Sequence, residues 1–495
     1  MLALSDLAAD RPHICGVGGP LEDIDIMGKR KAPELYRAPF PLYTVKIDPK
    51  TGLIITAGGG GASKTGIKNG VHFLSFELVG SQHSATLLHS HDTGICATMN
   101  MALGGDVIAA GQDGNCSLMQ FRQRARKEAR PTVTKDGAGE QGGTRRRGGK
   151  GQNGNRGGDV SRTKDDSLQV LVEDIGTVQS DLSPQDPVQK CVCFSSDLKL
   201  LLTGGADGFI RVWEFPSLKE KLKFKAHKDE VEDLHISPDN KHIVTVGRDF
   251  ACNLWSGDQL ALGLCWHENM PHITQKMYRS QSCRFAKVED QKDALRLYTV
   301  QIPHKRERKP LPCYLTKWDG RSFLPLLTKP CGNEVISCMN VSDSGTFLGL
   351  GTITGSVAIY IAFSLQRLYY VQESHGIVVT DLAFLPDDPK SKPAKGNNEV
   401  AMLSVAVDSR CQLHSVRTRK CGIAAGHPDC PGHGATWLLR DATHCGRVVK
   451  ARRAGRDSAL QEVGKRVVNE LGVPGRGSPT SPIPTTSVCC DPSAL

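Results

Sequence analysis

Short apolar segments separated by tight, glycine-containing turns recur along the chain. The stretch TGGADGFIRVW at 203–213 aligns with TVGRDFACNLW at 245–255 at a constant offset of 42 residues, so that the turn Asp and the final Trp coincide. The stretches at 109–119 and 350–360 follow the same frame. Each one consists of an apolar strand, a turn that holds Gly and often Asp, and a second strand. The pattern therefore predicts a repeated β-hairpin.

Another short strand precedes each hairpin, as in KCVCFS and VEDLHIS. A period of about 40–45 residues with four short strands per unit is typical of WD40-type β-propellers. We expect an all-β, seven-bladed WD40-type propeller over 38–417, with a disordered N-terminal extension at 1–37 and an irregular, disordered tail at 418–495. The predicted blades centre on residues 40–78, 83–121, 168–215, 222–257, 280–320, 332–364 and 375–416.

Three His–Asp pairs recur with the repeat. His91 precedes Asp113 by 22 residues, His227 precedes Asp249 by the same distance, and His375 precedes Asp408 across an insertion. One interpretation makes them catalytic pairs. Because they recur with the repeat, we favour a structural role, in which a buried His bonds the Asp of the turn in each of these blades.

The stretch TAGGGGASKTGIKNGVHF at 56–73 raises a different question. It resembles a phosphate-binding loop, but Ser63 occupies the position before Lys64 where that motif requires glycine, and a strand rather than a helix follows Gly70. In the blade frame the stretch is the hairpin turn of the first blade, enlarged by nine residues. Loops on rigid scaffolds commonly bind partners, so this loop is the first candidate site.

The positive charge of the chain is confined to two segments. The net charge is +10, and residues 122–164 and 417–495 carry +9 and +6, which leaves the remainder at −5. Nucleic-acid binding by the whole body is therefore not supported. We expect 122–167 to be a disordered basic insertion between the second and third blades, and DNA or RNA binding through 122–164 is the weaker alternative to a solvated linker.

Three segments together resemble a known family. They are APELYRAPFPLY at 32–43, the pattern G-G-G-G-x-x-x-x-G-I-x-N at 58–69, and GTFLGLGTITGSVAIYIAFSLQ at 345–366. They are similar to the endoplasmic-reticulum exchange factors for the Sar-type small GTPase. The resemblance implies a propeller that promotes GDP release without covalent chemistry and so starts assembly of the COPII vesicle coat for transport to the Golgi.

The resemblance also implies site residues in the enlarged loop. Asn69, Ile67 and Gly66 fall on the family's active element, and a potassium ion is expected at the backbone of Gly58–Asn69; no organic cofactor or small-molecule substrate is expected. No His lies 22 residues before Asn69, where Ile47 stands, so we expect Asn69 to lack a structural partner and to behave as a surface residue. The predicted frame of the loop that binds the GTPase is Gly58, Gly59, Gly60, Gly61, Lys64 and Lys68.

One feature departs from the family. Its members carry a membrane span after the last blade and lie on the cytosolic face of the endoplasmic reticulum, whereas the tail at 418–495 contains no apolar run long enough to span a bilayer. We therefore expect this chain to be cytosolic or nuclear. Two other functions remain open: a DNA-binding transcription regulator that acts through the basic insertion, and a passive WD40 scaffold.

Overall fold

The computed structural model describes most of the repeat region. The described residues are 32–62, 66–80, 82–125, 168–268, 270–274, 276–288, 291–305, 307–388 and 395–418. The predictions of disorder for most of the N-terminal extension, the basic insertion and the tail lie outside these residues. Within them, no helix is long and apolar enough to cross a membrane.

The described residues form seven four-stranded antiparallel sheets, which confirms the predicted seven-bladed all-β propeller. In the first three blades, the turns predicted from Gly and Asp lie between the second and third strands. The strands of these blades are β2 (Leu42–Ile47), β3 (Ile54–Gly58), β4 (Gly70–Val79) and β5 (Gln82–Asp92); β6 (Thr98–Gly104), β7 (Val107–Gln112), β8 (Asn115–Ala125) and β9 (Leu168–Gln179); and β10 (Gln189–Phe194), β11 (Leu200–Gly205), β12 (Phe209–Glu214) and β13 (Glu220–Lys225).

The remaining four blades repeat this order, except that the seventh takes its outer strand from the start of the chain. Their strands are β14 (Val231–Ile236), β15 (Ile243–Gly247), β16 (Cys252–Ser256) and β17 (Gln259–Gly263); β18 (Tyr278–Val288), β19 (Gln291–Pro303), β20 (Cys313–Asp319) and β21 (Pro325–Gly332); β22 (Ile336–Val341), β23 (Phe347–Thr352), β24 (Val357–Ile361) and β25 (Gln366–Val371); and β26 (Val379–Phe384), β27 (Asn398–Ala406), β28 (Arg410–Arg417) and β1 (Glu34–Arg37).

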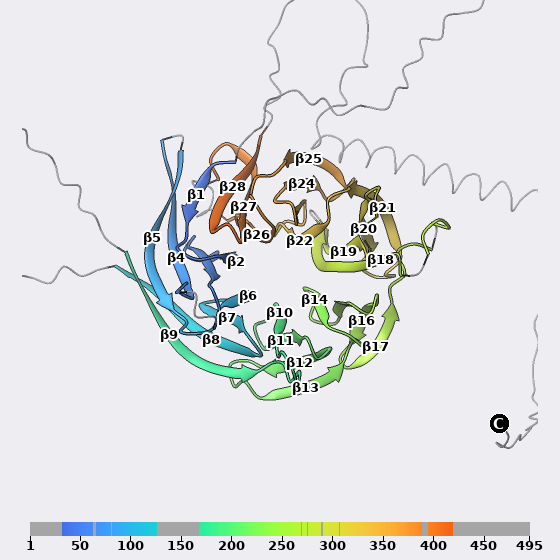
Figure 1. Ribbon diagram of the computed structural model, residues 1–495, viewed down its shortest axis with the longest axis horizontal. Helices are drawn as coiled ribbons and strands as arrows, with labels where there is room; N and C mark the ends of the chain where they lie inside the picture. The colour runs from blue at the N-terminus through green and yellow to red at the C-terminus, as the bar shows by residue number, and fades with distance from the viewer. Residues whose placement is uncertain are drawn as a thin grey trace, which may run out of the picture. The chain divides into compact units, whose positions relative to one another are not determined.

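The strand order gives the ring two distinct faces. The first strands, such as β2, β6 and β10, lie near the centre, and outer strands such as β5 and β13 lie at the perimeter (Figure 1). We call the upper face the one that carries the turns between second and third strands and the connections between blades. The lower face carries the other turns. The enlarged loop after β3 therefore lies on the upper face.

Apolar side chains pack between neighbouring blades. There are seven buried clusters, and each joins one pair of adjacent blades around the ring. The cluster between the seventh and first blades contains Leu403 and Leu413 from one side and Leu42 and Val45 from the other, all at most 3% exposed. Burial of such side chains stabilises each interface by about 1.5–3 kcal/mol per residue.

At two of these interfaces, an aspartate on one inner strand bonds three groups on the neighbouring inner strand. Asp381 Oδ2 on β26 accepts hydrogen bonds from the Thr44 hydroxyl at 2.8 Å, the Val45 amide at 3.1 Å and the Lys46 ammonium at 2.5 Å, all on β2. Asp233 on β14 makes the same three kinds of contact with β18. Each carboxylate is thus satisfied by the next blade, which fixes the register between blades as well as their packing.

Strand β1 closes the ring, which corrects two expectations. Residues 34–37 were expected in a disordered extension, but they pair antiparallel with β28 and complete the seventh sheet. The basic insertion was expected between blades, but it follows β8 and precedes β9, which are neighbours in the second sheet. Both differences arise because an outer strand can come from a segment distant in sequence, so the blade boundaries are shifted from the repeat boundaries.

Two of the three predicted His–Asp pairs are present. His227 Nδ1 lies 2.9 Å from Asp249 Oδ1, its Nε2 lies 2.8 Å from the Thr245 hydroxyl, and Trp255 Nε1 donates to that hydroxyl at 2.9 Å. Burial alone would raise the pKa of Asp249, but the hydrogen bonds from His227 and from nearby backbone amides lower it to about 2. The pair is therefore a structural link between the turn and the inner strands.

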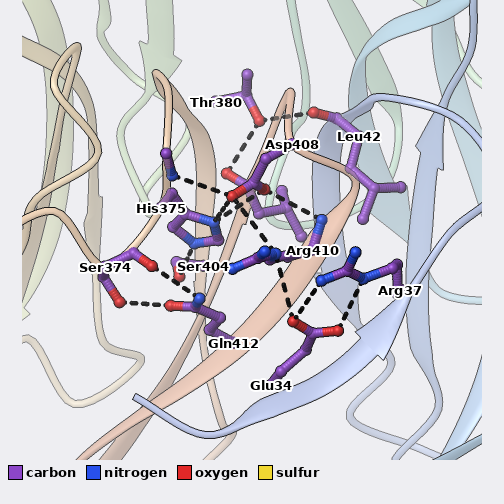
Figure 2. Close-up of polar contacts among 12 residues, drawn as sticks. Glu34, Arg37, Leu42, Ser374, His375, Thr380, Ser404, Asp408, Arg410 and Gln412 are labelled. Atoms are coloured by element: carbon purple, nitrogen blue, oxygen red, sulfur yellow. Dashed lines mark hydrogen bonds and ion pairs between the residues drawn. The ribbon is translucent and has the colours of Figure 1, made fainter. Parts of the chain in front are cut away.

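The seventh blade contains the second pair (Figure 2). His375 Nδ1 lies 3.1 Å from Asp408 Oδ1, and its Nε2 lies 2.7 Å from the Ser404 hydroxyl. His414 replaces the Trp of the fourth blade: its Nε2 lies 2.7 Å from the same hydroxyl, and burial lowers its pKa to about 3. A neutral imidazole donates at one nitrogen and accepts at the other, so it continues the chain of hydrogen bonds.

The predicted pair His91–Asp113 is wrong. β5 extends through Asp92, so His91 lies on the outer strand of the first blade rather than in the connection between blades, where His227 and His375 lie. Its Nε2 lies 3.5 Å from Asp174 Oδ1 on β9. The length of β5, which the spacing in the sequence does not reveal, moves this histidine away from the turn.

The closing strand predicts a pH dependence of stability. The Tyr36 hydroxyl on β1 lies 2.7 Å from His72 Nδ1 on β4, and burial, with a smaller effect of His89, lowers the pKa of His72 to about 4. An unfolded chain binds this proton near pH 6.5, so folding with a neutral His72 loses stability as the pH falls below that value. Between pH 7.5 and 5 we expect His72 to account for about 2 kcal/mol of lost stability.

Urea unfolding of the wild type and His72→Gln at both pH values measures this contribution. Glutamine does not titrate, and the other buried histidines are present in both proteins. The loss between pH 7.5 and 5 should therefore be smaller in His72→Gln by about 2 kcal/mol. An equal loss in both proteins would show that His72 is not held neutral by the fold.

Candidate functional site

The enlarged loop of the first blade connects β3 and β4 on the upper face. Its two ends are held together by the pairing of Gly58 with Gly70, the last rung of the β3–β4 ladder. The structure describes loop residues 59–62 and 66–69, and the predicted loop residue Lys64 lies outside them. The predicted residues Gly66, Ile67 and Lys68 are all exposed, and Ile67 has 40% of its surface exposed. The loop therefore presents an apolar and a cationic side chain to solvent.

Asn69 organises this loop from below, which corrects the expectation of a surface residue without a structural partner. Asn69 is only 5% exposed. Its Oδ1 accepts a hydrogen bond from the Gly61 amide at 2.8 Å, and its Nδ2 donates to the carbonyls of Gly61 at 3.3 Å and Gly94 at 2.9 Å. These partners could not be predicted from the sequence because they are backbone groups, one of them in the connection to the second blade.

The glycine run is required by close packing at the base of the loop. Gly59 has a φ of +146°, and a Cβ there would lie 2.0 Å from Asn69 Oδ1. A Cβ on Gly58 would lie 1.9 Å from the Pro41 carbonyl oxygen, which also accepts a hydrogen bond from the Gly59 amide at 3.0 Å. Gly61 and Gly66 have positive φ values of +71° and +76°. Glycine is thus needed both for space and for conformation.

The connection at 93–97 forms a second ordered loop beside the first. Gly94 donates to Asp92 Oδ1 at 2.8 Å, and the Thr93 hydroxyl donates to the Cys96 carbonyl at 2.8 Å. At its tip Ile95 is 73% exposed. Sequence reasoning missed this loop, although an isoleucine in the turn-like stretch DTGIC was a signal. Asn69 bonds Gly61 in the first loop and Gly94 in the second, so it connects the described parts of the two loops on the upper face.

The predicted residues do not all gather at one site. Gly58, Gly59, Gly60, Gly61, Gly66, Ile67, Lys68 and Asn69 belong to the loop of the first blade. The two His–Asp pairs lie in the fourth and seventh blades and hold those blades together. The loop from 58 to 69 contains no carboxylate and offers backbone carbonyls, two Lys residues and one buried amide side chain. Such a set suits recognition of a partner.

Comparisons with known proteins bear on the fold and on the family of the chain. The family described as WD domain, G-beta repeat matches residues 176–214 and 218–256. Guanine nucleotide-exchange factor SEC12 of Mus musculus is 57% identical over 394 residues, which cover 80% of this chain and 93% of that protein, and its counterpart from Rattus norvegicus is 56% identical over the same shares. SEC12-like protein 2 of Arabidopsis thaliana is 25% identical over 231 residues, which are 47% of this chain and 52% of that protein.

The fold and the repeat matches define a WD40 β-propeller protein. Within that class, the extent and identity of the match to the mouse and rat proteins show that the chain belongs to the SEC12 guanine nucleotide-exchange factor family.

The packing of Gly59 against Asn69 predicts the effect of a single methyl group. In Gly59→Ala the new Cβ would collide with Asn69 Oδ1, so the amide side chain must leave its position and release both loops. We expect faster amide hydrogen exchange at Gly61 and nearby loop residues, with a melting temperature of the propeller that falls by only a few degrees, about the effect of 1 kcal/mol.

Gly376→Ala is the matched control. Gly376 also lies in a connection on the upper face, but a Cβ there meets no atom within 4 Å. Its hydrogen exchange should match that of the wild type. Unchanged exchange at Gly61 in Gly59→Ala would show that Asn69 does not hold the loop.

Proposed function

We propose that this protein promotes GDP release from a small GTPase of the Sar type, with the loop at 59–69 as the active element. Membership of the SEC12 family supports the activity, and the buried Asn69, which ties two exposed loops together, supports the location. On this proposal the chain acts at the cytosolic face of the endoplasmic reticulum and starts COPII coat assembly through its GTPase. It performs no covalent chemistry.

The mechanism requires a rigid wedge. A GTPase holds GDP through its phosphate loop, a magnesium ion and two switch segments. A factor that binds the nucleotide-free state more tightly than the loaded state shifts the equilibrium toward release. An ordered loop loses little conformational entropy on binding, so more of its contact energy remains available for that shift. The hydrogen bonds of Asn69 to Gly61 and Gly94 supply this order in the free protein.

Exposed side chains provide the contacts. Ile67 and Ile95 are 40% and 73% exposed, and each lies on one of the two loops that Asn69 joins. Apolar side chains held at the surface by an ordered backbone are suited to insertion between segments of a partner. Lys68 adds an exposed cation beside Ile67, and Lys64 belongs to the same predicted contact set.

A potassium ion fits the chemistry of the same loop, and we propose that backbone carbonyls between Gly58 and Asn69 bind it. The loop contains no acidic residue, and rings of neutral carbonyl oxygens are a known way to hold potassium. Among the described residues there is no group of three or more His, Cys, Asp or Glu that could hold a metal ion, so side-chain ligation by such a set is not the alternative here. When bound, the ion would stiffen the loop.

Neither alternative function gains an observation in its favour. The basic segment needed for DNA or RNA binding lies almost entirely outside the described residues. A passive scaffold would not need a loop enlarged by nine residues and ordered by a buried amide. The exchange factor is therefore the function that the described site supports.

Ile67→Ala tests the proposed role of the loop. Ile67 is exposed, so its truncation should leave the melting temperature unchanged, while the rate of release of labelled GDP from a purified Sar-type GTPase should fall about tenfold or more, as for loss of one central contact. The measurement is the rate at which the fluorescence of GTPase-bound, labelled GDP falls as the nucleotide is released, with and without the full chain.

Asp249→Ala is the opposite control. It removes the partner of the buried His227 and should cost about 1–3 kcal/mol of stability. The folded fraction of this variant should nevertheless accelerate GDP release from the GTPase as the wild type does. Failure of the wild type to accelerate release would reject the proposed function. Normal release by Ile67→Ala would reject only the assignment of the loop.

The potassium proposal is tested by exchanging the cation. In buffers where potassium is replaced by lithium, we expect faster amide hydrogen exchange of the loop amides and slower GDP release, because lithium is too small for the same carbonyl ring. Loop exchange rates that are equal in both salts would contradict a potassium site.

A further inference from the structure

A groove of about 580 Å³ lies on the lower face, between the fourth and fifth blades. The loop that joins β14 to β15 forms one wall, and the end of β18 with the turn after β20 forms the other. It therefore opens on the face opposite the enlarged loop of the first blade. Nothing in the proposed exchange mechanism uses it.

Three exposed cations line this groove. Lys241, Lys287 and Arg321 are exposed, and none of them forms an ion pair with another described residue. Asp239 is the one acidic residue among the groove's described lining, and its Oδ1 already accepts hydrogen bonds from the Ser237 hydroxyl at 2.5 Å and the Lys241 amide at 3.2 Å. Cations thus outnumber carboxylates in the lining, while Asp239 and Asp343 lie close enough to Lys241 and Lys287 to interact with them electrostatically.

A histidine in the same groove has an unused nitrogen. His242 packs its ring edge-on against Phe323 at 5.4 Å between centroids, and its Nδ1 is buried without a hydrogen-bond partner among the described residues. Buried polar atoms are nearly always paired, so an unpaired one indicates a missing partner. The wall of the groove therefore contains a polar atom that the described residues leave without a hydrogen bond.

Large apolar side chains are exposed on the adjoining rim. Leu324, in the turn that carries Arg321, is 60% exposed, and Leu326 on β21 is 51% exposed. Phe363, in the corresponding turn of the sixth blade, is 58% exposed and is joined to this hairpin by Lys317, whose Nζ donates to the Phe363 carbonyl at 2.5 Å. Exposed apolar groups next to exposed cations are the combination that binds the surface of an anionic membrane.

We propose that the groove of Lys241, His242, Lys287 and Arg321 binds the phosphate group of an anionic lipid, with Leu324 and Phe363 entering the boundary of the acyl chains. Charge complementarity selects the headgroup, and the apolar rim selects a lipid surface over a free anion. Bound in this way, the propeller directs its upper face, with the enlarged loop, away from the membrane. The inference does not depend on the proposed exchange activity.

Flotation with vesicles tests this site. The full chain is mixed with phosphatidylcholine vesicles that contain or lack about one fifth phosphatidylserine, at physiological salt. The wild type should float with the anionic vesicles only. The triple variant Lys241→Gln, Lys287→Gln, Arg321→Gln should lose about tenfold or more in partitioning, since each basic side chain near such a surface contributes about a factor of five.

The matched control removes the same charge elsewhere. Lys221→Gln, Lys223→Gln, Lys225→Gln neutralises three cations on β13 at the perimeter of the third blade and should bind nearly as the wild type does. If vesicle partitioning falls equally in both triple variants, or falls in neither, the groove is not the binding site and the attraction comes from charge spread over the rest of the chain. No flotation of the wild type would also overturn it.

A second pair of measurements separates lipid from free phosphate. Leu324→Ser with Phe363→Ser should lower vesicle partitioning while leaving calorimetric binding of inorganic phosphate unchanged. If inorganic phosphate binds through the three cations but vesicles do not, the groove is a site for a soluble anion and the lipid proposal is wrong. The melting temperature of each variant verifies that it is folded.

Discussion

Closure of the ring is the constraint on which the rest of the structure depends. A single blade cannot bury its two faces, so each sheet needs both neighbours, and the last interface forms only if the start of the chain returns to the end of the repeat. β1 pairs with β28, the apolar cluster of Leu42 and Leu413 fills the junction, and Asp381 bonds three groups on β2. The buried neutral His72 beside Tyr36 belongs to the same junction.

The same junction seats the candidate site. The connection from β1 to β2 contains Pro41, whose carbonyl accepts the Gly59 amide and approaches Gly58 so closely that no side chain fits there. From the other side, the connection to the second blade supplies the Gly94 carbonyl to Asn69. The described ends of the enlarged loop are thus held by the closing segment and by the next blade, so their position depends on the closed ring. On the proposed function, this attachment is what would let the loop act as a wedge.

Much of the fold follows from the sequence because the repeat is local. The hairpins around Asp207 and Asp249, and the link from His227 to Asp249, depend on residues within one unit and its neighbour. β1 could not be predicted, because its partner β28 lies at the far end of the repeat. Because β5 extends through Asp92, His91 does not reach Asp113 in the turn of the second blade, and the sequence does not reveal the length of β5. The backbone partners of Asn69 also leave no pattern in the sequence. Local signals thus located the loop, while its burial and order required the three-dimensional structure.

On the proposed function, the upper face, through the loop at 59–69 and the connection at 93–97, engages a GTPase that has lost its nucleotide. Hydrogen–deuterium exchange of the full chain, with and without a nucleotide-free Sar-type GTPase, tests this contact. Binding there should slow exchange in these two segments and leave exchange in the turn at 320–324 on the lower face unchanged. Slower exchange confined to the lower face or the perimeter, with the two upper loops unchanged, would contradict it.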